Sequence, residues 1–323
     1  MRSLFSFILV LFFAQISFAF QVGLVLDRGG KDDKSFNNAA YEGVMKAQKE
    51  LGITSKVVEA IDNNSFDVLL RQFASRNYDL VIAVGFAQKD AVSRIAKQFP
   101  KVQFAVVDAE VGASNVRSLL FEEHEGSFLV GALAALTTKS NKIGFIGGMD
   151  IPMIRRFEMG YIAGAKHINP KINVSSNFIG VTSEAWNNPA KAKELSLSQY
   201  AAGVDVIFGA AGASTMGIFD AAEDKKQKAI GVDSNQNWVK PGYILTSMLK
   251  RVDVAVFDSV KLAKDGKFTG GIMRFGLESN GVDYALDQHN EKLISTDMSK
   301  KIDEIKKQII AKKIDVPDFY KKK

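Results

Sequence analysis

The sequence predicts an α/β fold of two doubly wound lobes, each built on a parallel β-sheet. Apolar runs of strand length alternate with amphipathic segments of helix length along most of the 323 residues, which is typical of parallel sheets covered on both faces. The strands fall into two sets that divide near Phe121–Gly126. The stretch "KIGFIGGMDIPMIRRFEMGYIAGAK" of the second set also repeats the theme of "VGLVLDRGGKDDKSFNNAAYEGVMK" in the first, because both run strand, Gly-Gly, acid, helix.

The first set of elements supplies one lobe. Its apolar runs predict strands at Gln21–Leu26, Ser55–Glu59, Leu80–Val84, Val102–Val107 and Val116–Phe121. Amphipathic spacing predicts helices between them at Asn37–Leu51, Ser65–Ser75 and Ala87–Gln98.

The second set supplies the other lobe by the same criteria. Strands are expected at Lys142–Ile146, Ile172–Phe178, Asp205–Phe208, Lys228–Val232 and Tyr243–Thr246. Helices are expected at Gly126–Thr137, Ile154–His167, Pro189–Ala202 and Thr215–Asp224. Ligands of open α/β sheets bind outside the carboxyl ends of the strands, so two facing lobes predict a cleft between those ends.

Residues 1–19 have the pattern of a cleavable signal peptide. Arg2 precedes the apolar run Leu4–Phe13, and Ser17-Phe18-Ala19 forms a small-x-small cleavage site. A transmembrane anchor is the alternative, but the run is short for a bilayer. The chain has no cysteine, which excludes an N-terminal lipid-modified cysteine and thiolate metal sites. The sequence thus predicts a periplasmic protein, secreted through a cleavable signal peptide and not lipid-anchored.

Charge and motifs exclude several function classes. The net charge of +6 owes much to lysines in the tail, which we interpret as the solvated face of a terminal helix and not as a nucleic-acid surface. The stretch "GGKDDKS" has the wrong spacing for a phosphate-binding loop. His124, His167 and His289 are far apart, and no nucleophile elbow occurs. We expect no enzyme, no catalytic residue, no metal and no cofactor.

The polar and glycine residues that could line the cleft follow strands of both lobes. Any single one could also be a turn residue or a helix cap, as Ser35 could be, but their recurrence at strand ends favours a binding cleft. The candidates at these positions are Asp27, Ser35, Gly85, Phe86, Asp108, Gly209, Gly212 and Asp233.

Two aromatic residues stand in polar surroundings. Phe36 follows Ser35 at a predicted helix start, where core packing is the alternative, and Trp186 lies in "TSEAWNNPAK". Rings from opposite lobes could sandwich a flat heterocycle, with Asn37 and Asp108 at its edge and Asp233 accepting from a diol.

The stretches "DDKSFNNAAYEG", "GFIGGMDIPMIRRFEMGYIAGAK", "GAAGAS" and "AIGVDSNQ…YILTSMLKR" resemble the basic membrane protein family. Its members are substrate-binding components of ABC transporters and include purine nucleoside receptors. The resemblance runs from about Gly23 to Gly281. It implies a type I periplasmic-binding-protein fold whose lobes are joined by a three-strand hinge.

The resemblance also implies roles for individual residues. Phe36 and Trp186 would sandwich the base, and Asn37 and Asp108 would contact its edge. Asp233 and Lys250 would hold the ribose hydroxyls. Gly85-Phe86 and the stretch Gly209–Gly212 would shape the walls, and Asp27 is a weaker candidate. Trp186 stands where nucleoside receptors of the family have Phe, which changes the pocket volume.

These observations predict a monomeric receptor that captures a nucleoside and delivers it to an ABC permease in the inner membrane. The expected N-terminal lobe comprises residues 20–121 and 250–270, and the C-terminal lobe comprises residues 122–249 and 271–323. A sugar or vitamin receptor on the same fold, such as a flavin-binding one, is the alternative, followed by a nucleoside-cleaving enzyme.

Overall fold

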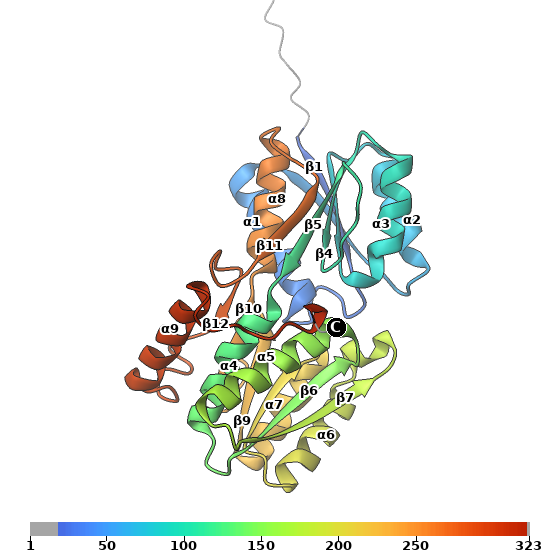
Figure 1. Ribbon diagram of the computed structural model, residues 1–323. Coiled ribbons are helices and arrows are strands. Elements are labelled where there is room, and N and C mark those ends of the chain that lie inside the picture. Colours follow the sequence, from blue (N-terminus) through green and yellow to red (C-terminus); the bar gives the residue numbers. More distant parts are fainter. Residues whose placement is uncertain (1–18, 322–323) are drawn as a thin grey trace, which may run out of the picture.

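The structure is a computed structural model and describes residues 19–321. The predicted signal peptide therefore lies, except for its last residue, outside the described residues. Two six-stranded sheets form the cores of two α/β lobes (Figure 1). Within residues 19–321, no helix is long and apolar enough to cross a membrane.

The first lobe contains a fully parallel sheet in the order β11-β5-β4-β3-β1-β2. Its inner strands β1, β3 and β4 are almost continuous apolar runs, and β3 is buried at every position, as expected of a sheet with helices on both faces. The strands are β1 (Gln21–Leu26), β2 (Thr54–Glu59), β3 (Leu80–Val84), β4 (Gln103–Val107), β5 (Val116–Phe121) and β11 (Gly271–Phe275). The helices around them are α1 (Phe36–Leu51), α2 (Ser65–Ala74), α3 (Lys89–Gln98) and α8 (Val252–Lys264).

The second lobe repeats this order as β12-β10-β9-β8-β6-β7, with only β12 antiparallel to its neighbour. Its strands are β6 (Lys142–Met149), β7 (Asn173–Gly180), β8 (Val206–Ala210), β9 (Lys228–Asp233), β10 (Ile244–Lys250) and β12 (Val282–Tyr284). Its helices are α4 (Glu123–Thr137), α5 (Pro152–Ile168), α6 (Pro189–Ala201), α7 (Thr215–Lys225) and α9 (Thr296–Ile310). The repeat that the two similar sequence stretches predict therefore appears in the structure as the same strand order in both sheets.

The chain crosses between the lobes three times: from β5 to α4, from β10 to α8 and from β11 to β12 (Figure 1). The predicted return to the C-terminal lobe at residue 271 is wrong, because Gly271–Phe275 pairs with β5 in the first sheet. The third crossing therefore follows Phe275. This edge strand escapes prediction because four of its five residues are exposed, so it lacks the apolar run of a central strand.

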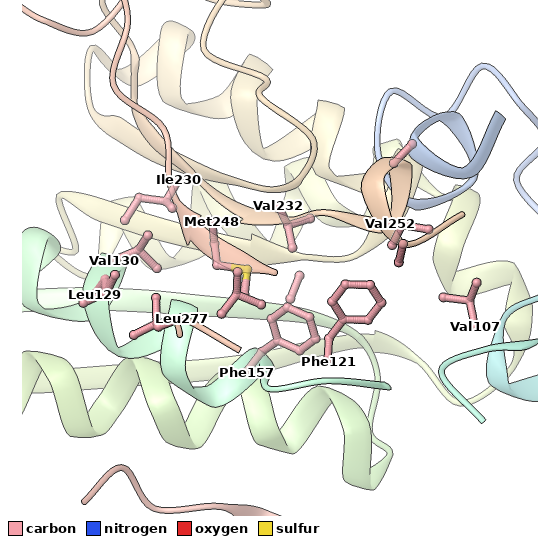
Figure 2. Packing of buried hydrophobic residues seen from close by; sticks show 14 of the residues in the cluster. Val107, Phe121, Leu129, Val130, Phe157, Ile230, Val232, Met248, Val252 and Leu277 are labelled. Atoms are coloured by element: carbon pink, nitrogen blue, oxygen red, sulfur yellow. The ribbon is translucent and has the colours of Figure 1, made fainter. Parts of the chain in front are cut away.

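The lobes share one apolar cluster near the crossings. Figure 2 shows Val107 and Phe121 of the first lobe gathered with Phe157 and Val232 of the second. All four side chains are buried. Because this cluster packs against both sheets, it places the carboxyl ends of their strands face to face.

Arg156 of α5 braces the first crossing. Its buried guanidinium donates to the carbonyl of Phe121 and to Glu123 Oε2, each at 2.6 Å, and to Asp318 Oδ1 at 2.7 Å. The C-terminal segment is thereby tied to the hinge. Burial by itself lowers the pKa of Arg156, but these carboxylates raise it above its ordinary value, so the group stays charged.

Candidate functional site

A cavity of about 610 Å³, part of it open to solvent, lies between the two lobes. Its walls come from the carboxyl ends of strands and from the helices that follow them, as the predicted cleft requires. Of the twelve predicted residues, ten line it: Asp27, Phe36, Asn37, Gly85, Phe86, Asp108, Trp186, Gly212, Asp233 and Lys250.

The structure places the other two candidates behind the wall. Ser35 is fully buried, and its hydroxyl donates to Asp233 Oδ2 at 2.5 Å, so it supports a cavity residue. Gly209 packs against α7, where a Cβ would lie 2.5 Å from Ile218 Cδ1. Neither residue belongs to the lining set.

Sequence reasoning missed further lining residues. Arg28 follows Asp27 and was hidden by the charged context of the loop. The other missed residues are apolar or are helix caps, which look like core or turn residues in sequence. They are Asp33, Met153, Ile154, Phe157, Ala213 and Val232, whereas the lining residues Ala210 and Ala211 belong to the predicted wall stretch Gly209–Gly212.

Phe36 and Trp186 reach the cavity from opposite lobes. Phe36 is the first residue of α1, whereas Trp186 lies in a short 3₁₀ turn, Ser183–Asn187, after β7. The indole is seated over Gly148 of β6, where a Cβ would lie only 2.2 Å from Trp186 Cζ3. Glycine at this position therefore makes room for the tryptophan ring.

Asn37 has most of its hydrogen-bonding capacity used within the first lobe. Its Oδ1 accepts the amide of Asp27 at 2.9 Å, and its Nδ2 donates to Asp33 Oδ2 at 3.1 Å. The Asp33 carboxylate also accepts the amides of Ser35, Asn37 and Asn38 and so caps α1. An amide nitrogen has two donors, and among the described residues one hydrogen bond from Nδ2 is formed, to Asp33.

Asp108 and Asp233 occupy matching places in the two lobes, after β4 and at the end of β9. Both have left-handed backbone, with φ of 64° and 65°. Such residues cost about 1–3 kcal/mol each and gather at functional sites. Asp108 lines the cavity, and its Oδ1 is a buried acceptor with no partner among the described residues.

Lys250 joins these carboxylates at the end of β10. Its ammonium lies 2.6 Å from Asp108 Oδ2 and 3.1 Å from Glu123 Oε1, and 5.1 Å from the centre of the Phe36 ring. Burial by itself lowers the pKa of Lys250, but Asp108, Glu123 and Asp233 together raise it. The lysine is therefore charged at neutral pH.

Burial dominates the protonation of the acids around it. Desolvation raises the pKa of Asp108 to about 7, against the lowering effect of Lys250. It also raises the pKa of Asp233 to about 6 and that of Asp27 to about 6. The cavity combines aromatic ring faces, buried carboxyl groups with raised pKa values and one lysine that is paired with carboxylates. This combination suits a flat ligand that carries hydroxyl and N–H donors.

The raised pKa of Asp27 should be detectable in how the stability of the protein depends on pH. Its folded pKa of about 6 exceeds the ordinary value of 3.8, so the folded state binds the proton more tightly. As the pH rises from 4 to 6, the unfolded state loses its proton first, and about 3 kcal/mol of unfolding free energy is lost. Asp108 and Asp233 add their own pH dependence, so urea denaturation should show that Asp27→Asn loses only this share: its stability falls less between pH 4 and 6 and exceeds that of the wild type at pH 7. Parallel pH curves for the two proteins would contradict the assignment.

The two lobes and the cavity between them define a two-lobed solute-binding protein. In agreement, a solute-binding protein of an ABC transporter system from Aeropyrum pernix has the same fold, with a TM-score of 0.84, 29% identity and coverage of 92% of this chain and 93% of that chain. Residues 20–319 match the Bmp family, described as ABC transporter substrate-binding protein PnrA-like. The chain belongs to this family.

Two relatives illustrate its range. The CD4+ T-cell-stimulating antigen of Listeria monocytogenes is 37% identical over 93% of this chain and 88% of its own length. The ABC transporter nucleoside-binding protein BmpA of Lactococcus lactis is 34% identical over 92% of this chain and 89% of its own length.

The relatives correct the localisation prediction. A protein of Pyrococcus abyssi that is named a lipoprotein is 34% identical over 82% of this chain and 68% of its own length. Such names contradict the prediction of a periplasmic protein without a lipid anchor. That prediction rested on a missing residue type, because the chain has no cysteine, and for the same reason an anchor on this chain is not shown.

Proposed function

We propose that this substrate-binding protein captures a nucleoside, with a purine base, between its two lobes and delivers it to an ABC permease without chemical conversion. The observation that carries the proposal is that Phe36 and Trp186, from different lobes, line one cavity. Aromatic faces bind a base by stacking, which contributes about 1–3 kcal/mol per base. The Lactococcus relative named a nucleoside-binding protein supports the same ligand class.

Polar groups supply the rest of the recognition. Asp108 Oδ1 is an unpartnered acceptor that suits an N–H at the base edge, and Asn37 adds one donor. The buried carboxylate of Asp233 suits a pair of ribose hydroxyls, and Lys250 adds a donor beside them. Residues of both lobes of one chain line the cavity, and we propose that the protein acts as a monomer.

A ligand panel tests this proposal. Thermal shift followed by calorimetry would compare inosine, guanosine, adenosine and cytidine with ribose, arabinose, hypoxanthine and riboflavin. We expect purine nucleosides to stabilise the protein, by about 2.7 kcal/mol at a concentration 100-fold above Kd. Stabilisation by sugars or by riboflavin alone would overturn the ligand class. Inosine should be recovered intact after incubation, and release of hypoxanthine would identify an enzyme instead.

A further inference from the structure

Besides the shared apolar cluster and the residues that line the cavity, a group of polar and cation–π contacts joins the two lobes. The carbonyl of Lys34 accepts from Gln236 Nε2 at 2.9 Å, and the carbonyl of Ser35 accepts from Ser234 Oγ at 3.2 Å. The Lys34 ammonium lies 5.4 Å from the centre of the Trp238 ring. We call this set the clasp, defined by Lys34, Ser35, Ser234, Gln236 and Trp238. None of these residues lines the cavity.

Hydrogen bonds within the second lobe hold the clasp residue Gln236 in place independently of the first lobe. Gln236 is fully buried, its side-chain Oε1 accepts the backbone amide of Val232 at 2.9 Å, and its backbone N–H donates to Ser247 Oγ at 2.9 Å. Both partners lie in the second lobe, so the carboxamide keeps its orientation when the lobes separate. Its Nε2 has one bond among the described residues, and that bond goes to Lys34. Opening the lobes therefore gives up this bond.

The half on the first lobe presents two backbone carbonyls, of which that of Ser35 also accepts the amide of Ala39 in α1 at 2.9 Å. Lys34 has a left-handed backbone, with φ of 56°, which lysine adopts rarely. It directly precedes Ser35 and α1, whose first turn is held by the Asp33 carboxylate. Trp238 remains half exposed, at 51%, so covering its ring with Lys34 costs little desolvation. The clasp thus closes between two surfaces that need little rearrangement.

From this geometry we infer that the clasp keeps a fraction of the ligand-free protein closed and so raises the affinity for every ligand by the same factor. A contact made only in the closed form shifts the open–closed equilibrium, and the apparent affinity scales with the population of the competent form. Ser234 and Trp238, the two clasp residues varied below, lie outside the cavity lining, so their loss is expected to leave selectivity unchanged. The affinity part rests on the proposed binding function, whereas the closed fraction does not.

The variants are Trp238→Leu, Ser234→Ala and their combination. Tyr243→Leu is the matched control, because Lys228 Nζ lies 5.7 Å from the Tyr243 ring and both residues belong to the second lobe. Since the chain has no cysteine, Ile61→Cys and Val181→Cys can carry one spin label on each lobe. Both positions are more than 80% exposed and follow β2 and β7.

The first measurement uses the ligand-free protein. Electron–electron double resonance should show a short-distance population that shrinks in the double variant and is unchanged in Tyr243→Leu. Identical distance distributions for the double variant and the parent would overturn the inference. This outcome is independent of ligand identity, so it cannot be confused with failure of the nucleoside assignment.

The second measurement is calorimetry with inosine, guanosine and adenosine. Loss of one hydrogen bond and one cation–π contact should raise Kd by about 3- to 10-fold in the double variant, equally for the three ligands. A change in the ratios of the three Kd values would also overturn the inference, because it would make these residues selectivity determinants.

Discussion

Replacing both Phe36 and Trp186 by alanine is expected to abolish tight nucleoside binding while the protein stays folded. Each ring contributes about 1–3 kcal/mol of stacking, so each single variant should weaken binding by about 5- to 150-fold, and the double variant by up to the product. The rings enter one cavity from different lobes, so each loss also removes a contact that favours closure. Calorimetry with inosine measures the effect.

Two further variants make this result specific. Trp186→Phe keeps a ring face and should bind within a few-fold of the parent. Phe268→Ala removes a partly buried aromatic outside the cavity lining and should leave the affinity unchanged. Near-native affinity in the Phe36→Ala, Trp186→Ala double variant would eliminate the stacking arrangement.

Lys250→Met is expected to cost the most stability of any single change in the cavity. Breaking a buried ion pair from one side costs about 3–5 kcal/mol, because the partner charge is left uncompensated. Here Lys250 compensates Asp108 and Glu123 at once, with both of these side chains 2–3% exposed. The free energy of unfolding in urea should fall by that amount at pH 7.5.

Compensating changes should restore part of the loss. Asp108→Asn in the Lys250→Met background removes one orphan charge and should recover stability. Lowering the pH to 5 should act in the same direction, because the pKa of Asp108 is already about 7 with the lysine present and its loss raises that pKa further. Lys261→Met breaks an exposed ion pair with Asp265 and should cost less than about 1 kcal/mol. A Lys250→Met protein as stable as the parent would show that the ion cluster contributes no net stability.

The central strands of the fold could be predicted because buried strands appear in the sequence as apolar runs. The apolar runs of β1 and β3 are recognisable since parallel strands are covered on both faces. The edge strand β11, mostly exposed, and the three-residue β12 carry no such signal. Their sheet membership depends on pairing with strands distant in the chain, which explains the misplaced boundary at residue 271.

Some features of the candidate site could likewise be predicted from the sequence, and others could not. The cavity lining by Asp27, Asp108 and Asp233 could be predicted, because the ends of parallel strands meet at one edge. The position of Ser35 behind Asp233 could not, since it depends on contact between residues 198 positions apart.

The strand–helix alternation, the twofold repeat and the chemical types at the strand ends can be recognised in the amino-acid sequence, because they follow from local periodicity and turn chemistry. Three features emerge only from the packing of the folded chain: which side chains line one cavity, the pairing of Lys250 with Asp108 and Glu123, and the contact of Lys34 with Trp238. These contacts join residues from different lobes or crossings, and their geometry depends on how the two sheets pack around the shared hinge cluster.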